Sequence, residues 1–287
     1  MTDEALLRIA VPNKGALAEA AAAMLSDAGY RQRWDTKDLV LVDEANGVEF
    51  YYLRPRDIAV YVGEGILDLG LTGRDMLLDA GAPADEALAL GFGHSKFRFA
   101  APADGKLACL EDLDGKRIAT SYPGLLKRFL AGRGLTARLI HLDGAVESAV
   151  RLGVADAIAD VVETGSTLRK AGLVVFGDVI LESEAILIRR AAAPEPPGLG
   201  QLLARLSGVI VARDYVLVDY DIEEPNLPAA TALAPGLEGP TVSPLAKPGW
   251  CAVRALVPRL GHQGLMDRLW AAGARAILVT DVSACRL

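Results

Sequence analysis

The chain has 287 residues, 52% of them hydrophobic, and a formal net charge of −7 from 30 basic and 37 acidic side chains. This length suits about two domains, and the acidic balance excludes a general electrostatic attraction to nucleic acid or to a membrane surface. The acidic start and the lack of about 18 consecutive apolar residues argue against an export signal and a membrane span, so we expect a cytoplasmic protein. The cysteines, Cys109, Cys251 and Cys285, have no zinc-like spacing and are odd in number, so we expect buried thiols.

The first part of the chain alternates strand-like and helix-like segments. Residues 7–12 are typical of a β-strand, and a turn with Gly15 leads into an alanine-rich helix that ends at Gly29. Residues 56–75 then predict a helix, a glycine break, a second strand and a Thr72-Gly73 loop.

The same order of elements returns in the second part of the chain. Residues 116–135 predict a strand, a turn and a helix, and residues 144–165 predict a helix, a glycine break, a strand and a Thr-Gly loop. We therefore expect two similar lobes with parallel sheets, because strands and helices alternate. Ligands bind at the carboxyl ends of such strands, so four loops should line one cleft. These loops start at Pro12, Thr72, Tyr122 and Glu163.

The composition changes at Pro194, where "PEPPGLG" predicts a linker. A helix over residues 201–215 follows, and then strands and helices in the order βαββαβ, which is the order of a ferredoxin-like domain. The predicted boundaries are 1–93 with 190–213 for the first lobe, 94–189 for the second lobe and 214–287 for the last domain. A domain placed after a complete cleft is expected to be regulatory or oligomeric.

The loop "ETGSTLRK", residues 163–170, is the most suggestive motif of the chain. Backbone N–H groups of a glycine turn and of a helix start, together with Ser and Thr hydroxyls, suit a phosphate, although an ordinary helix cap explains the same residues equally well. Neither of the two common nucleotide fingerprints is present, and no G-x-S-x-G occurs. The three histidines, His94, His141 and His262, have no metal-ligand spacing.

Charged residues beside the other loops are weaker candidates. Lys14 in "VPNKG" and Arg54 in "YLRPRD" could bind a phosphate, but loop lysines and helix-start arginines usually face water. Asp156 and Asp160 flank the strand before the phosphate loop. They could accept hydrogen bonds from sugar hydroxyls, and salt bridges or helix capping are equally common uses.

These segments together resemble one family, the long form of ATP phosphoribosyltransferase. The resemblance rests on "RIAVPNKG", "RPRDIAVYVGEGILDLGLTGRD", "RIATSYP", "DGAVESAVRLGVADAIADVVETGSTL", "ATALAPGLEGPTVSPL" and "AILVTDVSACRL", which cover the chain in order. It implies an α/β protein with a two-lobed catalytic part, folded like a type II periplasmic binding protein. It also implies a C-terminal ferredoxin-like, or ACT-like, regulatory domain.

The resemblance also implies which residues bind the substrates. The 5-phosphate of 5-phosphoribosyl 1-pyrophosphate would lie on Glu163, Thr164, Gly165, Ser166 and Thr167, with Asp156 or Asp160 near the ribose. ATP and the pyrophosphate would draw on Lys14 and Arg54, as catalytic residues, and on Gly73, Arg74 and Asp75. The chain departs from many family members by carrying Ala16 where arginine is frequent and Ser166 where threonine is frequent.

The implied reaction is attack of adenine N1 of ATP on C1 of the ribose, which releases pyrophosphate in the first step of histidine biosynthesis. Mg²⁺ would be the cofactor, with ligands that the sequence does not identify. Histidine would inhibit by binding near Asp221, Thr241 and the backbone at Ala276, and the chain is expected to self-associate as a dimer or hexamer. Two other interpretations stay open: a non-enzymatic two-lobed module that binds a small anion, and a catalytically silent regulatory partner.

Overall fold

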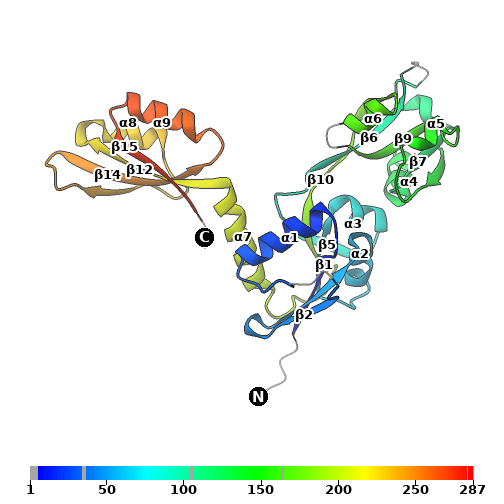
Figure 1. Ribbon diagram of the computed structural model, residues 1–287, viewed down its shortest axis with the longest axis horizontal. Helices are drawn as coiled ribbons and strands as arrows, with labels where there is room; N and C mark the ends of the chain where they lie inside the picture. The colour runs from blue at the N-terminus through cyan, green and yellow to red at the C-terminus, as the bar shows by residue number, and fades with distance from the viewer. Residues whose placement is uncertain (1–5, 34–36, 104–106, 163–164, 283, 287) are drawn as a thin grey trace. The chain divides into compact units, whose positions relative to one another are not determined.

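The computed structural model describes residues 6–33, 37–103, 107–162, 165–282 and 284–286 (Figure 1). The chain forms two compact units, Met1–Ala23 with Tyr30–Leu199, and Met24–Gly29 with Gly200–Leu287. The first unit contains two β-sheets, which define its first and second lobes, and the second unit contains one sheet. No helix in the described ranges is long and apolar enough to cross a bilayer.

The sheet of the first lobe has six strands in the order β2-β3-β1-β4-β11-β5. Their bounds are β1 (Leu7–Pro12), β2 (Val40–Asp43), β3 (Val48–Leu53), β4 (Leu69–Gly73), β5 (Ala84–Ala89) and β11 (Ala185–Arg190). The helices of this part of the chain are α1 (Ala16–Asp27), α2 (Pro55–Gly63) and α3 (Arg74–Ala80). β1 runs parallel to β3 and β4, whereas β11 is antiparallel to both of its neighbours. The sheet is therefore mixed, and the expectation of a purely parallel sheet was wrong.

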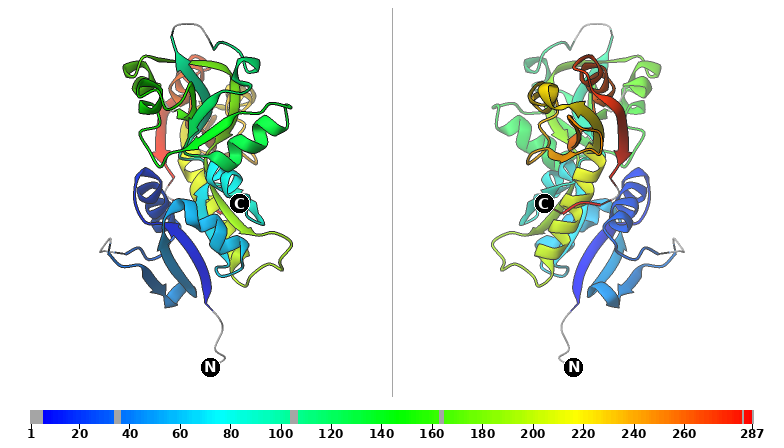
Figure 2. Two further views of the ribbon diagram at one scale, coloured as in Figure 1. Left: turned by 90° about the vertical axis from the view of Figure 1, so that its right-hand side faces the viewer. Right: turned by 90° about the vertical axis from the view of Figure 1, so that its left-hand side faces the viewer.

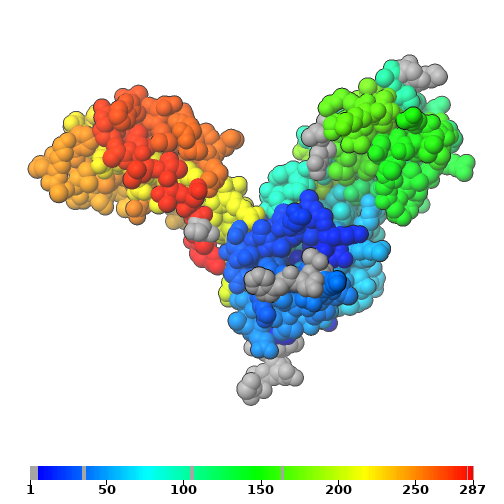
Figure 3. All heavy atoms as spheres, viewed as in Figure 1, coloured from blue at the N-terminus to red at the C-terminus, as the bar shows by residue number. Residues whose placement is uncertain are grey.

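The sheet of the second lobe has five strands in the order β10-β6-β9-β7-β8. Their bounds are β6 (Ser95–Pro102), β7 (Arg117–Thr120), β8 (Arg138–His141), β9 (Ala157–Val162) and β10 (Leu173–Ser183). The helices are α4 (Pro123–Ala131), α5 (Ser148–Arg151) and α6 (Ser166–Lys170). The atoms of this lobe form the turquoise-to-green mass in Figure 3. β7 is parallel to β8 and β9, and β6 is antiparallel to β9 and β10, so this sheet is mixed as well.

The two lobes share one topology. The order β3-β1-β4-β11-β5 in the first lobe matches β8-β7-β9-β6-β10 in the second, and in each lobe the fourth strand enters from the other lobe. The same arginine–aspartate ion pair, with a hydrogen bond from the arginine backbone, also recurs at the strand starts. Arg8 N–H donates to Asp68 Oδ2 at 2.8 Å, and Arg117 N–H donates to Asp156 Oδ2 at 2.9 Å. The predicted internal duplication and the type II periplasmic-binding-protein fold are confirmed.

Two predicted boundaries differ from the structure. Residues 185–189 were expected in the second lobe, but β11 pairs with β4 and β5, where its apolar run "AILI" is buried in the first lobe. The helix α7 (Leu199–Asp214) was expected in the first lobe, but residues from Gly200 onward belong to the second unit. There the Arg213 guanidinium donates to Asp27 Oδ2 at 2.8 Å.

Aromatic side chains build the core of the second lobe. Phe97 is fully buried, and Phe99 stacks on Phe176 with ring centroids 5.9 Å apart. The ring of Tyr122 meets Phe97 edge to face at 5.4 Å. Full burial of such a side chain contributes about 1.5–3 kcal/mol, so this cluster fixes the base of the loop that carries Tyr122.

The sheet of the second unit has the order β13-β14-β12-β15, with every neighbouring pair antiparallel. Its elements are β12 (Tyr215–Glu223), α8 (Leu227–Leu233), β13 (Thr241–Pro244), β14 (Trp250–Pro258), α9 (His262–Ala271) and β15 (Arg275–Asp281). Helices α8 and α9 lie over one face of the sheet (Figure 1, Figure 2). Val216, Val218, Tyr220 and Ile222 face the core on that side, while the alternate residues of β12 lie on the other face. The predicted βαββαβ domain is confirmed.

Candidate active site

In the first lobe, three predicted site residues lie at one edge of the sheet. β1, β3 and β4 are parallel neighbours, so the residues after their carboxyl ends lie along the same edge. Lys14 follows β1, Arg54 follows β3, and Arg74 follows β4. Lys14 and Arg54 are both exposed, and Arg54 is the N-cap residue directly before α2. They are therefore accessible to a ligand at this edge.

Arg74 does not lie free at this edge. Its guanidinium makes a two-pronged contact with Glu86, at 2.9 and 2.8 Å, and also contacts Glu184 Oε1 at 3.2 Å. The hydrogen bond with Glu86 is the main reason why the pKa of Arg74 is raised, and the same contact lowers the pKa of Glu86. Because two carboxylates already neutralise it, Arg74 fits a structural role better than the predicted contact with ATP.

Glu184 shows what that structural role is. Its Oε2 accepts a hydrogen bond from the Gly91 N–H at 3.1 Å, so the carboxylate joins the two segments that cross between the lobes. Gly91 has a φ of 71°, a left-handed conformation that glycine adopts without strain. Arg74 and Glu184 therefore join the segments that cross between the lobes, and this use of Arg74 argues against its predicted contact with ATP.

Asp75 is buried, with 5% of its surface exposed, and faces the second lobe. The Ser183 hydroxyl donates to Asp75 Oδ1 at 2.9 Å, and the Asp75 N–H donates to Ser183 Oγ at 3.0 Å. Gly73 leaves room for this carboxylate, because a Cβ there would collide with Asp75 Oδ1. The predicted Gly73-Asp75 pair therefore forms a rigid turn at the lobe boundary.

The predicted phosphate loop leads into α6, with Gly165 as the N-cap residue. Gly165 has a φ of 66°, and the following Ser166 and Thr167 are exposed at the first turn of the helix. Leu168 is buried and anchors the turn to the lobe. Glu163 and Thr164 lie outside the described residues. The described part, Gly165 to Thr167, thus presents hydroxyl and backbone N–H donors at the carboxyl end of β9.

Asp156 lies at the opposite end of β9 from this loop. Its carboxylate accepts from the Arg117 N–H at 2.9 Å, from Nε at 3.2 Å and from Nη2 at 2.7 Å. The strand between Asp156 and the loop, Ala157–Val162, spans about 20 Å at roughly 3.3 Å per residue. This position argues against the predicted place of Asp156 near the ribose, because the residue is used in the ion pair with Arg117 at the strand starts.

Replacing Asp156 by Asn tests this correction. Hydrogen bonds to Arg117 hold the pKa of Asp156 below its usual range. The stabilisation from this ion pair is therefore fully present above about pH 3.9, the ordinary Asp pKa. It is lost as the pH falls through the lowered pKa of the folded protein. We expect Asp156→Asn to reduce the free energy of unfolding by roughly 0.5–1 kcal/mol at pH 7, since the pair is partly exposed. Turnover and the KM of both substrates should stay within about twofold of wild type; a large rise in KM measured in steady-state kinetics would restore Asp156 to the site.

Asp160, unlike Asp156, lies on the side of β9 that leads to the predicted phosphate loop. It lies near the carboxyl end of β9 and is half-buried, with Oδ1 accepting the Val161 N–H at 2.8 Å. Burial raises the pKa of Asp160, the Val161 hydrogen bond and the charge of Arg56 lower it, and the charges of Glu147 and Asp75 raise it further. Burial of a carboxylate disfavours its charged form, and carboxylates with a raised pKa are common at functional sites.

Arg56 and Tyr122 complete the site, and neither was among the predicted site residues. Arg56 Nη1 donates to the Ser121 carbonyl at 2.6 Å, and its guanidinium lies 4.4 Å from the centre of the Tyr122 ring. Burial, and then the charge and hydrogen bond of Asp75, raise the pKa of Tyr122, so the phenol stays protonated at neutral pH. These contacts join the loop after β4 to the loop after β7. Two of the four predicted loops therefore meet across the lobe boundary.

The predicted histidine site lies in the second unit. Asp221 and Thr241 lie on the open face of the sheet, since β14 pairs Asp221 with Ala252 and Thr241 with Arg254. They are two strands apart, about 10 Å across the sheet. Ala276 has a φ of 48°, at a bulge where the pairing of β15 with β12 shifts register. A strained non-glycine residue beside Asp221 supports a functional role for this part of the sheet.

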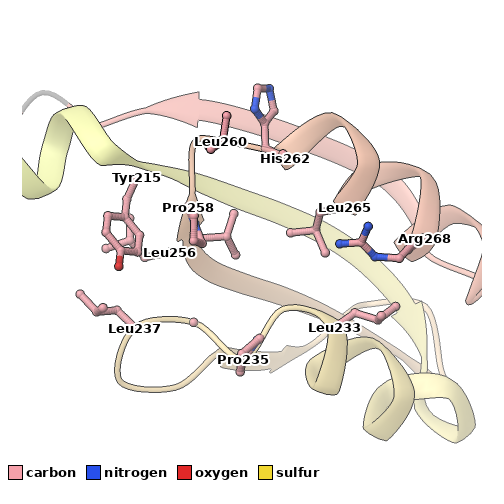
Figure 4. Close-up of a pocket in the computed structure, with 13 residues that line it drawn as sticks. Tyr215, Leu233, Pro235, Leu237, Leu256, Pro258, Leu260, His262, Leu265 and Arg268 are labelled. Atoms are coloured by element: carbon pink, nitrogen blue, oxygen red, sulfur yellow. The ribbon is translucent and has the colours of Figure 1, made fainter. Parts of the chain in front are cut away.

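A cavity of about 340 Å³ lies elsewhere in the same domain (Figure 4). Leu265 and Arg268 of α9 line one side and Leu237 lines another, while His262 points away from the centre. None of Asp221, Thr241 and Ala276 is among its lining residues. The cavity is therefore separate from the predicted contacts.

Within the described part of the chain, no group of three or more His, Cys, Asp or Glu side chains could hold a metal ion. Cys251 is buried as expected, whereas Cys109 is exposed and Cys285 is half-buried. Mg²⁺ usually binds through one or two carboxylates together with substrate phosphates, and Asp160 fits that use.

The topology and the site define the class of the protein. Two α/β lobes of the type II periplasmic-binding-protein fold meet at a polar boundary beside a phosphate-type loop, and a ferredoxin-like domain follows. This is a two-lobed ligand-binding protein with an added C-terminal domain.

Comparison with known proteins gives the family. Residues 54–208 match the family model for ATP phosphoribosyltransferase, and residues 212–284 match the model for the HisG C-terminal domain. An ATP phosphoribosyltransferase of Kocuria rhizophila is 61% identical over 282 residues, covering 98% of this chain and 100% of that protein. One from Streptomyces coelicolor is 57% identical over 287 residues, with 98% and 100% covered. The chain belongs to the ATP phosphoribosyltransferase family and is a pentosyltransferase.

A solved structure agrees with this assignment. The ATP phosphoribosyl transferase (HisG:HisZ) complex from Thermotoga maritima aligns with a TM-score of 0.61 and 26% identity. The alignment covers 70% of this chain and 97% of that chain. The alignment leaves part of this chain uncovered, and the match to the C-terminal family model spans residues 212–284.

Proposed function

We propose that this chain joins ATP to 5-phosphoribosyl 1-pyrophosphate, with adenine N1 attacking C1 of the ribose and pyrophosphate leaving, in the first step of histidine biosynthesis. The observation that supports this best is the polar boundary between the lobes. There, Arg56 and Asp75 of one lobe contact Tyr122 of the other, and Asp160 lies within reach of their charges. The boundary can therefore bring together two substrates held on different lobes.

Each lobe contributes a different group of donors. In the second lobe, Gly165, Ser166 and Thr167 would bind the 5-phosphate, and Asp160 would accept hydrogen bonds from the ribose hydroxyls. In the first lobe, Lys14 and Arg54 are exposed cations that would meet the phosphates of ATP and the departing pyrophosphate.

The reaction needs no covalent nucleophile, because adenine N1 already carries a lone pair. The bond from N1 to C1 forms as the bond from C1 to the pyrophosphate oxygen breaks, and the electron pair leaves with pyrophosphate. The protein therefore acts by aligning the two substrates and by stabilising the charge that develops on the leaving group. Protonated Tyr122 and the cation of Arg56 supply fixed donors at the boundary.

We propose Mg²⁺ as the cofactor, with Asp160 as the carboxylate that fits it. When bound, Mg²⁺ neutralises charge on the pyrophosphate. A chain with a net charge of −7 offers little positive charge to a polyphosphate, and this supports a role for a divalent cation.

We further propose that histidine inhibits the enzyme through the C-terminal domain, and that the chain forms a dimer or hexamer. Asp221 would accept from the ligand's ammonium group, Thr241 would donate to its carboxylate, and the backbone at Ala276 would complete the site. Because Asp221 and Thr241 are about 10 Å apart, a single small ligand would need contributions beyond these two side chains.

An activity assay tests the proposal. The pure protein with ATP, 5-phosphoribosyl 1-pyrophosphate and Mg²⁺ should form phosphoribosyl-ATP and pyrophosphate, and a chelator should stop the reaction. A binding module would instead return both ligands unaltered, and a silent partner would give no product while still binding histidine. Product formation that continues at full rate without divalent ions would contradict the proposed cofactor.

A further inference from the structure

The first turn of α4 in the second lobe is capped by a carboxylate from the first lobe. Asp79, in the last turn of α3, accepts a hydrogen bond from the Leu125 N–H at 2.9 Å. We propose that Asp79 is a positioning residue. By holding α4 against α3, it sets how closely the loops of the two lobes approach for the transfer reaction, so this inference rests on the proposed function.

Several contacts meet at Asp79. Its side chain is 17% exposed, and its Oδ2 lies 3.7 Å from Arg56 Nη1. The same Arg56 nitrogen donates to the Ser121 carbonyl at 2.6 Å, and Arg128 Nη2 donates to the Asp79 carbonyl at 3.3 Å. Arg56 and Asp79 belong to the first lobe, and Ser121, Leu125 and Arg128 belong to the second. The cluster therefore joins the lobes through both side chains and backbone.

The position of the carboxylate suits the helix end. The first N–H groups of a helix have no partner within the helix, and the helix dipole favours negative charge there. The residue before α4, Tyr122, makes no side-chain cap. Asp79 supplies this cap from the opposite lobe, so α4 has its N-terminal cap only while the lobes stay together.

Gly124 makes the close approach possible. A Cβ at Gly124 would collide with the backbone carbonyl of Asp79, which cannot move away as the end of a flexible side chain would. Gly132, at the other end of α4, would meet only ordinary contacts, the nearest at 3.5 Å. One glycine of this helix therefore serves the contact between the lobes, and the other does not.

The consequence for the reaction comes through Tyr122. The loop that carries Tyr122 runs directly into α4, so a shift of α4 changes the position of Tyr122 relative to Asp75 and Arg56. A displacement of about 1 Å between reacting groups can lower the rate by roughly a hundredfold. Each substrate's own loop lies within one lobe, so binding should suffer far less than turnover.

The test compares Gly124→Ala with Gly132→Ala in the full chain. We expect Gly124→Ala to lower kcat by about 10- to 100-fold and Gly132→Ala to change it by less than about twofold. Calorimetric titration with 5-phosphoribosyl 1-pyrophosphate and Mg²⁺ should give wild-type stoichiometry for both variants and a Kd within about threefold of wild type. Unchanged kcat in Gly124→Ala would overturn the inference. A fall in kcat matched by an equal fall in stoichiometry would also overturn it, because it would show loss of folded protein.

A second pair of variants tests the cap itself. Asp79→Asn keeps an acceptor for Leu125 but loses the charge, whereas Asp79→Ala loses both, so kcat should fall further in Asp79→Ala. Exposed Asp178→Asn is the control. The Leu125 amide should exchange its hydrogen faster in Asp79→Ala, and this readout needs no substrate. An unchanged exchange rate of the Leu125 amide in Asp79→Ala would overturn the proposed cap. Absence of turnover in the wild-type protein would instead count against the proposed function alone.

Discussion

Asp160→Asn should make the protein more stable at neutral pH and much less active. Burial raises the pKa of Asp160 in the folded protein, so the native state favours its protonated form. The stability that protonation adds is fully present below the unfolded pKa of about 3.9 and is lost as the pH rises through the raised value. An amide has no charge to desolvate, so unfolding in urea at pH 7 should show a larger free energy for the variant.

The loss of activity has a different cause. A carboxylate that accepts hydrogen bonds from ribose hydroxyls contributes about 1.5–3 kcal/mol, so kcat/KM for 5-phosphoribosyl 1-pyrophosphate should fall by roughly 10- to 100-fold. Asp156→Asn is the matched control directly before the same strand, with lower stability and unchanged activity expected. A variant at Asp160 that is destabilised yet fully active would remove this residue from the site.

Removing residues 215–287 should abolish inhibition by histidine and leave part of the activity. The cut falls between α7, which ends at Asp214, and β12, which begins at Tyr215. Rates measured with and without histidine should then be equal, because the predicted ligand contacts all lie beyond the cut. Some activity should be lost, since Arg259 donates to the carbonyls of Ala212 and Arg213 and so caps the end of α7.

A point variant addresses the predicted site without the truncation. Asp221→Asn should raise the histidine concentration needed for half inhibition by about tenfold or more, the usual cost of a lost charged hydrogen bond. Asp219→Asn is the control, because Asp219 lies two residues away on the same face and pairs with Arg254 at 2.7 Å. Equal inhibition of all three proteins would place histidine elsewhere.

The sequence was sufficient for the two-lobed repeat, because the repeated pattern is local. Strand, turn and helix signals recur in both halves, and the pair Asp68 and Asp156 marks the same position in each lobe. The pattern could not show that β11 returns to the first sheet or that the sheets are mixed. Those facts depend on pairing between strands about 100 residues apart in the chain, such as Ile186 with Thr72.

The site was predicted only in part for a similar reason. Glycine and small polar residues identify the loop at Gly165 from the sequence alone. The sequence does not reveal which residue a charged side chain pairs with. Arg74 and Asp156 are paired with carboxylate or guanidinium groups distant in sequence, so both looked free for a ligand. Arg56 lies beside Arg54 in the same motif, and only the fold distinguishes the residue that bridges the lobes.

We expect the turn at Gly165 to bind the sugar phosphate while the first lobe holds the purine. A crystal structure of the full chain with 5-phosphoribosyl 1-pyrophosphate and Mg²⁺ tests it most directly. The 5-phosphate should lie against the backbone N–H groups and hydroxyls of Ser166 and Thr167, with Asp160 facing the ribose. A donor bound with its 5-phosphate away from this turn would contradict it.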